Sequence, residues 1–284
     1  MMILIADSGS TKTDWRLIDE SGKISQAKTV GFNPYHQSSE DIARQLQEEL
    51  VPQVTKEVAG KALKIYFYGA GCATEAACQT VEKALQEVFP DGQTEVHNDL
   101  LAAARALCGH QAGIACIIGT GANSCLYDGE TIVDNVPPLG YILGDEGSAT
   151  WIGKQLLNGY FKRAMPDALR TPFEKRFDVS VGEVLDHVYR QPQANRYLAQ
   201  FSRFAFHHLK HPWIAQMIYE GLNQFLEKNV AQYENYQQQS VHFTGGVAFY
   251  YSNLLRQAAN DRGIRIQNIL ESPIAGLTLY HQPD

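Results

Sequence analysis

The first residues that could carry out chemistry follow an apolar run near the start of the chain, in ILIADSGSTKTDW (residues 3–15). Backbone N–H groups and hydroxyls in such a turn can hold a phosphate, and a carboxylate beside it can hold Mg²⁺ through water. The same residue types also make ordinary hairpin turns, so both interpretations stay open on this segment alone. The residues concerned are Asp7, Ser8, Gly9, Ser10, Thr11, Lys12 and Thr13.

The second group is the turn Gly119-Thr120-Gly121, which follows the apolar run IACII. Two glycines let a backbone approach a phosphate or a sugar closely. The third glycine of a dinucleotide fingerprint is missing and no helix pattern follows, which argues against a Rossmann site. The P-loop pattern G-x-x-x-x-G-K-[ST] occurs nowhere in the chain either. Together the two turns suggest loops that grip one polyphosphate from both sides.

The residue pair Asn98-Asp99 stands between a strand pattern and the helix pattern LLAAARALC. Asp99 could be a general base that takes a proton from a substrate hydroxyl, as phosphoryl transfer requires. The alternative is that the aspartate only caps the helix. His97 could be a ligand or a base, but a single histidine on a strand is more often structural.

Two further glycine-rich segments lie in the second half of the chain. Asp145, within GDEGS, stands before a long helix pattern and could accept hydrogen bonds from sugar hydroxyls. Gly245 and Gly246 follow the strand pattern SVHFT, where they would let a flat base or a ribose lie against the backbone. A close strand-to-helix turn is the alternative explanation for this glycine pair.

The elements that must position these residues form a pattern that occurs twice. Three strand patterns with a hairpin at residues 20–23 precede a helix pattern at 38–58, a strand at 63–71, a helix at 75–89 and a strand ending at Asp99. Strand, glycine turn, strand, Asp-Gly turn and strand then recur over residues 112–134. The chain is mostly helical from about 149 to 236, and SVHFTG is the last expected strand before a final helix at about 273–281.

This duplication predicts an α/β protein with two meander-plus-helix units and a cleft between them. Ligands of such sheets bind outside the carboxyl ends of the strands, where every glycine-rich segment of this chain is expected. The predicted first domain covers residues 1–110 and is joined by a C-terminal helix at about 271–284. The second covers 111–270 and contains the helical insertion at about 149–236.

Composition sets the protein class. The 284 residues are 44% hydrophobic and 19% charged, with a net charge of −7, and no Lys/Arg cluster supports nucleic-acid binding. No apolar stretch is long enough to span a bilayer, and no signal-peptide pattern precedes the first strand. The five cysteines form no C-x-x-C pair, which is typical of reduced thiols. We therefore expect a cytoplasmic protein without nucleic-acid or membrane partners.

The order of these motifs resembles the sugar-kinase/actin/Hsp70 ATPase superfamily. More narrowly, NDLLAAARAL, IIGTGANS, GYILGDEGSATWIGK and FTGGVAFYY resemble the N-acetylglucosamine kinases and the related BadF/BcrA-type ATPases. The resemblance extends from Asp7 to about Tyr280. It implies two ribonuclease H-like, actin-like domains that close around ATP and a sugar, and it implies a homodimer.

The resemblance also implies roles for individual residues. Asp7 would hold Mg²⁺ and residues 8–13 the phosphates, with Gly119, Thr120 and Gly121 as the second phosphate loop. Asp99 would be the base toward the 6-hydroxyl of an amino sugar, and Gly245 and Gly246 would contact the adenosine. Sugar contacts are implied for Asn33, Asn98, Asp99, Thr120, Gly121 and Asp145. Ser8 and Ser10 depart from the family pattern, because they stand where glycines are usual.

Three alternatives remain on the sequence. The sugar could be glucosamine, since no acetyl pocket is evident. The protein could be an ATPase that activates a dehydratase through an iron–sulfur cluster shared across a dimer, for which Cys116 and Cys125 are the candidates although core positions suit them better. It could also be a sensor or an actin-like structural protein, but the retained Asn98-Asp99 pair favours catalysis.

Overall fold

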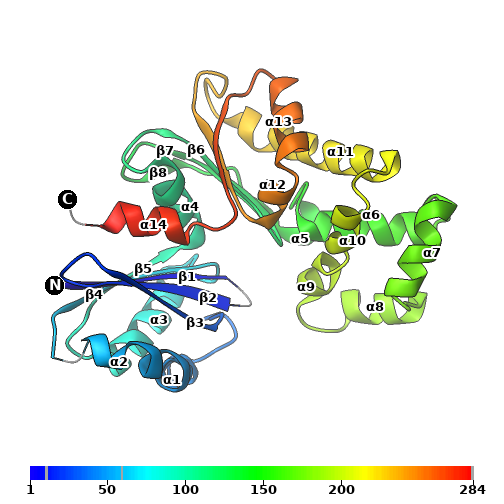
Figure 1. Cartoon of the computed structure of the whole chain (residues 1–284). Helices are drawn as coiled ribbons and strands as arrows, with labels where there is room; N and C mark the ends of the chain where they lie inside the picture. The colour runs from blue at the N-terminus through cyan, green and yellow to red at the C-terminus, as the bar shows by residue number, and fades with distance from the viewer. Residues whose placement is uncertain (10–11, 59, 283–284) are drawn as a thin grey trace. The chain divides into compact units, whose positions relative to one another are not determined.

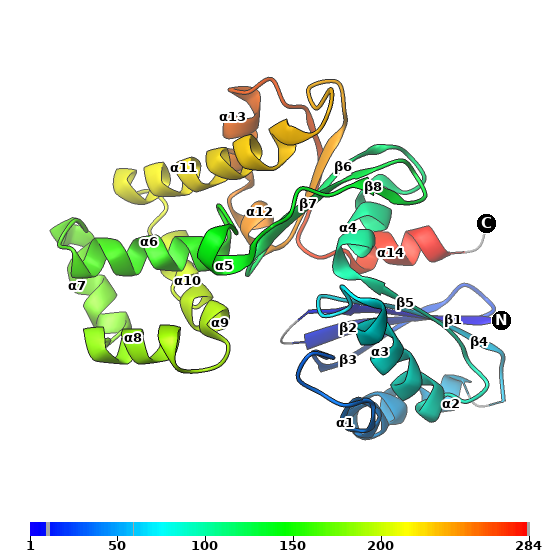
Figure 2. The ribbon, with the colours of Figure 1, turned by 180° about the vertical axis from the view of Figure 1, so that it is seen from behind.

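The computed structural model describes residues 1–9, 12–58 and 60–282. The chain divides into two compact units, shown in Figures 1 and 2. Unit 1 comprises Met1–His110, Gly129–Thr131 and Ser272–Asp284, and unit 2 comprises Gln111–Asp128 and Ile132–Glu271. This division assigns residues 129–131 to unit 1, whereas the sequence placed them in the second domain.

Unit 1 is built on a mixed sheet in the order β3-β2-β1-β4-β5. Its strands are β1 (Met2–Ser8), β2 (Lys12–Ile18), β3 (Ile24–Val30), β4 (Leu63–Gly69) and β5 (Gln93–Asn98). The first three pair antiparallel, and β1, β4 and β5 are parallel neighbours. The carboxyl ends of these three parallel strands therefore meet at one edge of the sheet.

Helices cover both faces of this sheet, as both ribbon views show (Figures 1 and 2). One face packs on α1 (Ser39–Gln45), the π-helical turn η1 (Leu46–Leu50), α2 (Val51–Val58) and α3 (Glu75–Val88). The other packs on α4 (Asp99–Cys108) and α14 (Ile274–His281). Trp15 is completely buried on the first face, and its indole N–H donates to Thr29 Oγ1 at 3.0 Å.

The predicted helix at 38–58 is confirmed, with a deviation that its spacing explains. Ser38 caps it by accepting from Asp41 N at 3.1 Å. Ile42, Leu46, Leu50 and Val54 repeat every four residues and are all buried. A regular α-helix would rotate such a stripe away from the core, because it has 3.6 residues per turn. The wider π-helical turn at Leu46–Leu50 compensates for this drift.

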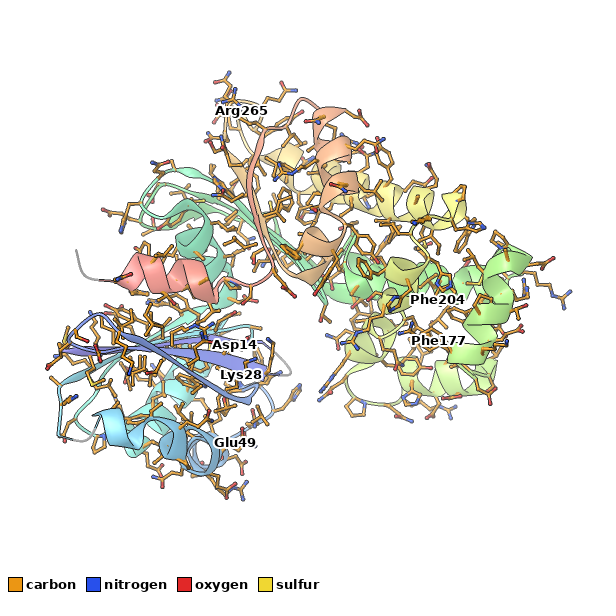
Figure 3. The ribbon with its side chains drawn as sticks, viewed as in Figure 1. Asp14, Lys28, Glu49, Phe177, Phe204 and Arg265 are labelled. Carbon is orange, nitrogen blue, oxygen red and sulfur yellow. The ribbon has the colours of Figure 1, made fainter. Side chains whose placement is uncertain are left out.

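Strand β3 is an edge strand whose outward backbone groups bond helix side chains. Val30 N donates to Glu49 Oε2 at 2.8 Å, and Gln53 Nε2 donates to the carbonyl of Lys28 at 2.8 Å. Figure 3 shows Glu49 on the helix beneath Lys28, and Lys28 beside Asp14 of β2. Covering an edge in this way limits pairing with other chains.

Unit 2 repeats the strand arrangement in the order β10-β9-β6-β7-β8. Its strands are β6 (Gly113–Ile118), β7 (Ala122–Tyr127), β8 (Ile132–Asp134), β9 (Val241–Thr244) and β10 (Ile266–Leu270). Strands β6, β9 and β10 are parallel, and β6-β7-β8 is an antiparallel meander. The predicted pair of ribonuclease H-like α/β units is thus confirmed. The expectation that SVHFTG is the last strand is wrong, because β10 follows it at the sheet edge.

The helices of unit 2 are α5 (Gly140–Leu143), α6 (Ala149–Phe161), α7 (Asp167–Arg176), α8 (Val181–Tyr189), α9 (Ala194–Ala199), α10 (Ser202–His207), α11 (Pro212–Lys228), the 3₁₀ turn η2 (Val230–Gln232), α12 (Gly246–Tyr250) and α13 (Ser252–Asn260). Aromatic rings join the helices of the insertion. Phe173 of α7 contacts Phe204 of α10, with ring centroids 5.1 Å apart. Phe177, just after α7, also faces Phe204, at a centroid distance of 6.3 Å (Figure 3). Within the described part of the chain, no helix is both long and apolar enough to cross a membrane.

Candidate active site

The predicted acidic residues of unit 1 meet at one edge of its sheet. Asp7 lies beside Tyr68 in the β1–β4 register, and Ser8 lies beside Gly69. Gly69 in turn lies beside Asn98, after which Asp99 begins α4. Topology therefore places Asp7 and Asp99 at the carboxyl ends of parallel strands, as the sequence predicts.

Asp7 is a partly buried carboxylate among like charges. Burial is the largest effect on its pKa, which rises to about 6, and the carboxylates of Asp14 and Asp99 raise it further. A hydrogen bond from Ser272 Oγ to Asp7 Oδ2, at 3.1 Å, opposes this shift, as does the more distant charge of Lys12. Like charges around a buried carboxylate favour a bound cation.

The ammonium group of Lys12 is paired within the sheet. Its Nζ lies 2.7 Å from Asp14 Oδ2, and Lys28 Nζ lies 3.8 Å from Asp14 Oδ1. Lys12 itself is exposed, so this pair is open to solvent. Its implied phosphate contact stays a prediction, and it would have to compete with Asp14.

The hydroxyls of Ser8 and Thr13 hold strands together. Thr13 Oγ1 donates to the Val30 carbonyl at 2.9 Å and lies 2.8 Å from Ser8 Oγ, which accepts from Phe32 N at 3.2 Å. Because the Thr13 proton is used, Ser8 must donate to Thr13. Both side chains are buried, and neither has a proton left for a phosphate. Their implied phosphate contacts stay a prediction, and a phosphate would have to compete with these bonds for the hydroxyl protons.

The backbone N–H of Gly9 is also used within the first turn. Gly9 N donates to the Lys12 carbonyl at 3.0 Å, which closes a tight turn between β1 and β2. Ser10 and Thr11, also predicted in this loop, lie outside the described residues.

Asp99 is the first residue of α4 and Asn98 is its cap. Asn98 Oδ1 accepts from Leu101 N at 2.8 Å, so the alternative that Asp99 is the cap is wrong. Burial raises the pKa of Asp99, while backbone N–H groups of Leu100 and of Asp99 itself lower it. The carboxylate is thus oriented by the helix start and made more basic by its surroundings.

Asn33 lies in a turn after β3 that the loop following β4 supports. Its Oδ1 accepts from Tyr35 N at 3.1 Å, and its backbone N–H donates to Gln37 Oε1 at 2.7 Å. A Cβ on Gly71 would lie 2.7 Å from Pro34 Cδ and 3.1 Å from Asn33 Oδ1. The amide oxygen of Asn33 is therefore used within the turn, and its NH₂ group is what it could offer a sugar.

His97 has the surroundings of a structural histidine. Its Nε2 lies 3.5 Å from Glu95 Oε2, and its ring centroid is 5.5 Å from that of Tyr68. Burial lowers its pKa, with a further decrease from Arg105. The imidazole is a neutral packing partner on the sheet face opposite Asn98.

In unit 2 the Gly119–Gly121 loop is held by the segment around the start of α6. Ala149 N donates to the Gly119 carbonyl at 2.9 Å, and Thr150 N to the Thr120 carbonyl at 3.1 Å. The Thr120 side chain is exposed at the tip of this loop. The loop is therefore preorganised, with its two glycines partly exposed and the Thr120 side chain exposed.

Asp145 has a structural role in this loop that the sequence did not reveal. Its Oδ1 accepts from Ala122 N at 2.9 Å, and a Cβ on Gly121 would lie 3.0 Å from the same oxygen. Asp145 has a left-handed backbone (φ 55°), and burial is the main cause of its raised pKa. The implied sugar contact stays a prediction and could use only Oδ2 freely.

Replacing Asp145 separates these two roles. Asp145→Ala leaves the buried Ala122 N–H without its acceptor, so we expect the free energy of unfolding to fall by about 1–3 kcal/mol. Asp145→Asn keeps an acceptor oxygen and should lose less than half of that. Urea unfolding of the two variants measures the difference. Equal losses would show that the contact with Ala122 does not hold the loop.

The glycine pair after β9 packs against the end of β6. Gly245 has a φ of +107°, and a Cβ there would lie 2.5 Å from the Ile118 carbonyl. Only glycine fits both the conformation and the space. The two glycine loops of unit 2 thus lie side by side at the carboxyl ends of β6 and β9, although adenosine contacts by Gly245 and Gly246 stay a prediction.

A cavity of about 650 Å³ lies elsewhere in unit 2, between α6 and α8. Its lining is mostly apolar and includes Leu157, Phe161, Val184 and Leu185. None of the predicted site residues lines it, so we do not assign the reaction to this cavity.

The donor set of unit 1 suits Mg²⁺ better than a metal bound fully by protein. Among the described residues no group of three His, Cys, Asp or Glu side chains could hold a metal. Mg²⁺ commonly uses one or two carboxylates with water and substrate phosphates, which Asp7 fits. Cys116 and Cys125 are fully buried, which fits core positions rather than a cluster shared with another chain.

The BadF/BadG/BcrA/BcrD ATPase family matches residues 6–278 of this chain. The chain belongs to this family. The match includes the strand-end acids of unit 1 and both glycine loops of unit 2, so the family resemblance predicted from the motifs is confirmed.

Individual relatives of this ATPase family member point to sugar kinases. A Porphyromonas gingivalis protein described as a candidate N-acetylglucosamine kinase is 42% identical, with a TM-score of 0.92 over 99% of this chain and 98% of its own. A Chromobacterium violaceum protein described in the same way is 15% identical, with a TM-score of 0.73 over 98% of both chains, and shows the shared fold alone.

One curated relative is the N-acetyl-D-glucosamine kinase of Dictyostelium discoideum. It is 26% identical over 170 residues, which is 55% of this chain. The matched part is 53% of that relative, so this chain spans about half of its length.

Proposed function

We propose that this protein is an ATP-dependent kinase that phosphorylates the 6-hydroxyl of N-acetylglucosamine. The near full-length similarity to the Porphyromonas gingivalis protein carries this proposal. Independent support comes from chemistry: two partly buried carboxylates at the strand ends of unit 1 and two glycine loops at the equivalent ends of unit 2.

Asp99 is the proposed general base. Its carboxylate would accept the proton of the sugar 6-hydroxyl as the oxygen attacks the terminal phosphoryl group. A base is most effective when its pKa is near the working pH, and burial raises that of Asp99. The N–H groups at the start of α4 keep the carboxylate in one orientation without using a second side chain.

Asp7 is the proposed anchor for magnesium. Mg²⁺ bound with ATP neutralises charge on the phosphates. Asp7 would hold it through water, and the turn at residues 8–13 together with the backbone of Gly119–Gly121 would hold the phosphates. The amide groups of Asn33 and Asn98 and the second oxygen of Asp145 would orient the sugar.

A coupled ADP-release assay with separate sugars tests this function. We expect the highest kcat/KM with N-acetylglucosamine and a value at least roughly tenfold lower with glucosamine, N-acetylmannosamine or glucose. Omitting Mg²⁺ should abolish turnover. A higher kcat/KM with glucosamine would mean that glucosamine, not N-acetylglucosamine, is the substrate. Equal ADP release with and without sugar would mean that the protein is an ATPase and not a sugar kinase. The homodimer is tested separately by light scattering.

A further inference from the structure

The chain passes from unit 2 to unit 1 between Glu271 and Ser272. On the unit 2 side, Glu271 Oε1 accepts from Tyr250 Oη at 2.8 Å. On the unit 1 side, Ser272 Oγ donates to Asp7 Oδ2 at 3.1 Å. Each of these neighbouring residues is thus tied into its own unit, and Ser272 is tied to the proposed magnesium anchor.

The helix that follows Ser272 gives its hydroxyl a defined position. Helix α14 lies so close to α4 that a Cβ on Gly276 would be 2.3 Å from the Ala106 carbonyl. Ile274 and Leu277 are buried with Ile5 of β1, the strand that carries Asp7. Ser272 is therefore held beside Asp7 by packing over the whole helix, although 265 residues separate the two in sequence.

We propose that Ser272 is a positioning residue for Asp7. By holding Oδ2 of Asp7, Ser272 directs the other carboxylate oxygen toward the magnesium–nucleotide complex. This inference rests on the proposed function, which places magnesium at Asp7. Without such a partner, the carboxylate of an aspartate can rotate about its last side-chain bond. Binding a metal then has to fix this rotation, and the lost conformational entropy weakens the metal affinity. Hydrogen bonds to metal-binding carboxylates commonly raise metal affinity, and their loss costs about 10–100-fold.

The test is a titration of Mn²⁺, a spectroscopic substitute for Mg²⁺, into protein with saturating ADP, followed by electron paramagnetic resonance. Ser272→Ala should weaken Mn²⁺ affinity about tenfold. Ser272→Thr keeps the hydroxyl and should stay within about threefold of the unmodified protein. The matched control is Ser21→Ala, because Ser21 Oγ also donates to an aspartate, Asp19 Oδ1 at 2.6 Å, in the exposed β2–β3 hairpin.

Three outcomes separate a failure of the Ser272 inference from a failure of the proposed function on which it rests. Unchanged Mn²⁺ affinity in Ser272→Ala, with reduced affinity in Asp7→Asn, overturns the role of Ser272 and leaves the proposed function standing. An equal loss in the alanine and threonine variants overturns positioning by the hydroxyl. Failure of the unmodified protein to bind Mn²⁺–ADP overturns the proposed function as well. Urea midpoints that are no lower than that of the unmodified protein establish that a loss of affinity does not come from unfolding.

Discussion

Replacing Asp99 with asparagine is expected to lower kcat for sugar phosphorylation by about 10³-fold, within the range of a lost general base. Asparagine fits the same space at the start of α4 and can still accept from Leu100 N, but it cannot take a proton. ATP binding should persist, because Asp7 and both glycine loops are unchanged. The coupled ADP-release assay measures kcat, and calorimetry with ATP measures binding.

Folding provides the control for this prediction. Burial raises the pKa of Asp99, so its charge is unfavourable in the folded protein and Asp99→Asn should be at least as stable at neutral pH. Asp91→Asn makes the same chemical change at an exposed position and should leave kcat unchanged. Near-native turnover by Asp99→Asn would assign the proton transfer to another group.

Strands with continuous apolar runs were predictable from sequence, and β10 was not. Runs such as MILIAD and IACII carry their own signal because both sheet faces are buried. In β10, Gln267 and Asn268 interrupt the apolar pattern and are exposed. Pairing with β9 forms this edge strand, and such pairing is a tertiary effect that local sequence does not report.

The same distinction applies to the site. Asp7, Asp99 and the glycine loops were found because strand ends and glycines are local signals. Ser272 was missed because its partner is far away in sequence, and nothing about a serine before Pro273 indicates a contact with Asp7. The sequence also suggested phosphate donors at Ser8 and Thr13, where the structure uses both hydroxyls to join β1, β2 and the segment after β3.

Asp7→Asn should produce opposite changes in activity and stability. Loss of the anchoring charge is expected to lower kcat/KM for Mg–ATP by at least about 10²-fold, because charge stabilisation by a metal is worth several kcal/mol. In the protein without nucleotide, the same change should raise the free energy of unfolding at pH 7.5 by about 2–3 kcal/mol. This gain follows from a pKa raised by burial from 3.8 to about 6.

The sign of the stability change gives it a pH signature. A folded-state pKa above the unfolded one means that protonated Asp7 favours folding, and this contribution is lost as the pH rises from about 4 through 6. The advantage of Asp7→Asn should therefore be largest above pH 7 and vanish below about pH 4. Urea unfolding across this pH range measures it.

Adding Mg–ADP should stabilise the unmodified protein more than the variant, since only a ligand that binds the folded state adds stability. If the stability difference between Asp7→Asn and the unmodified protein does not change with pH, the negative charge of Asp7 does not destabilise the folded protein. A bound cation would then gain little by neutralising that charge.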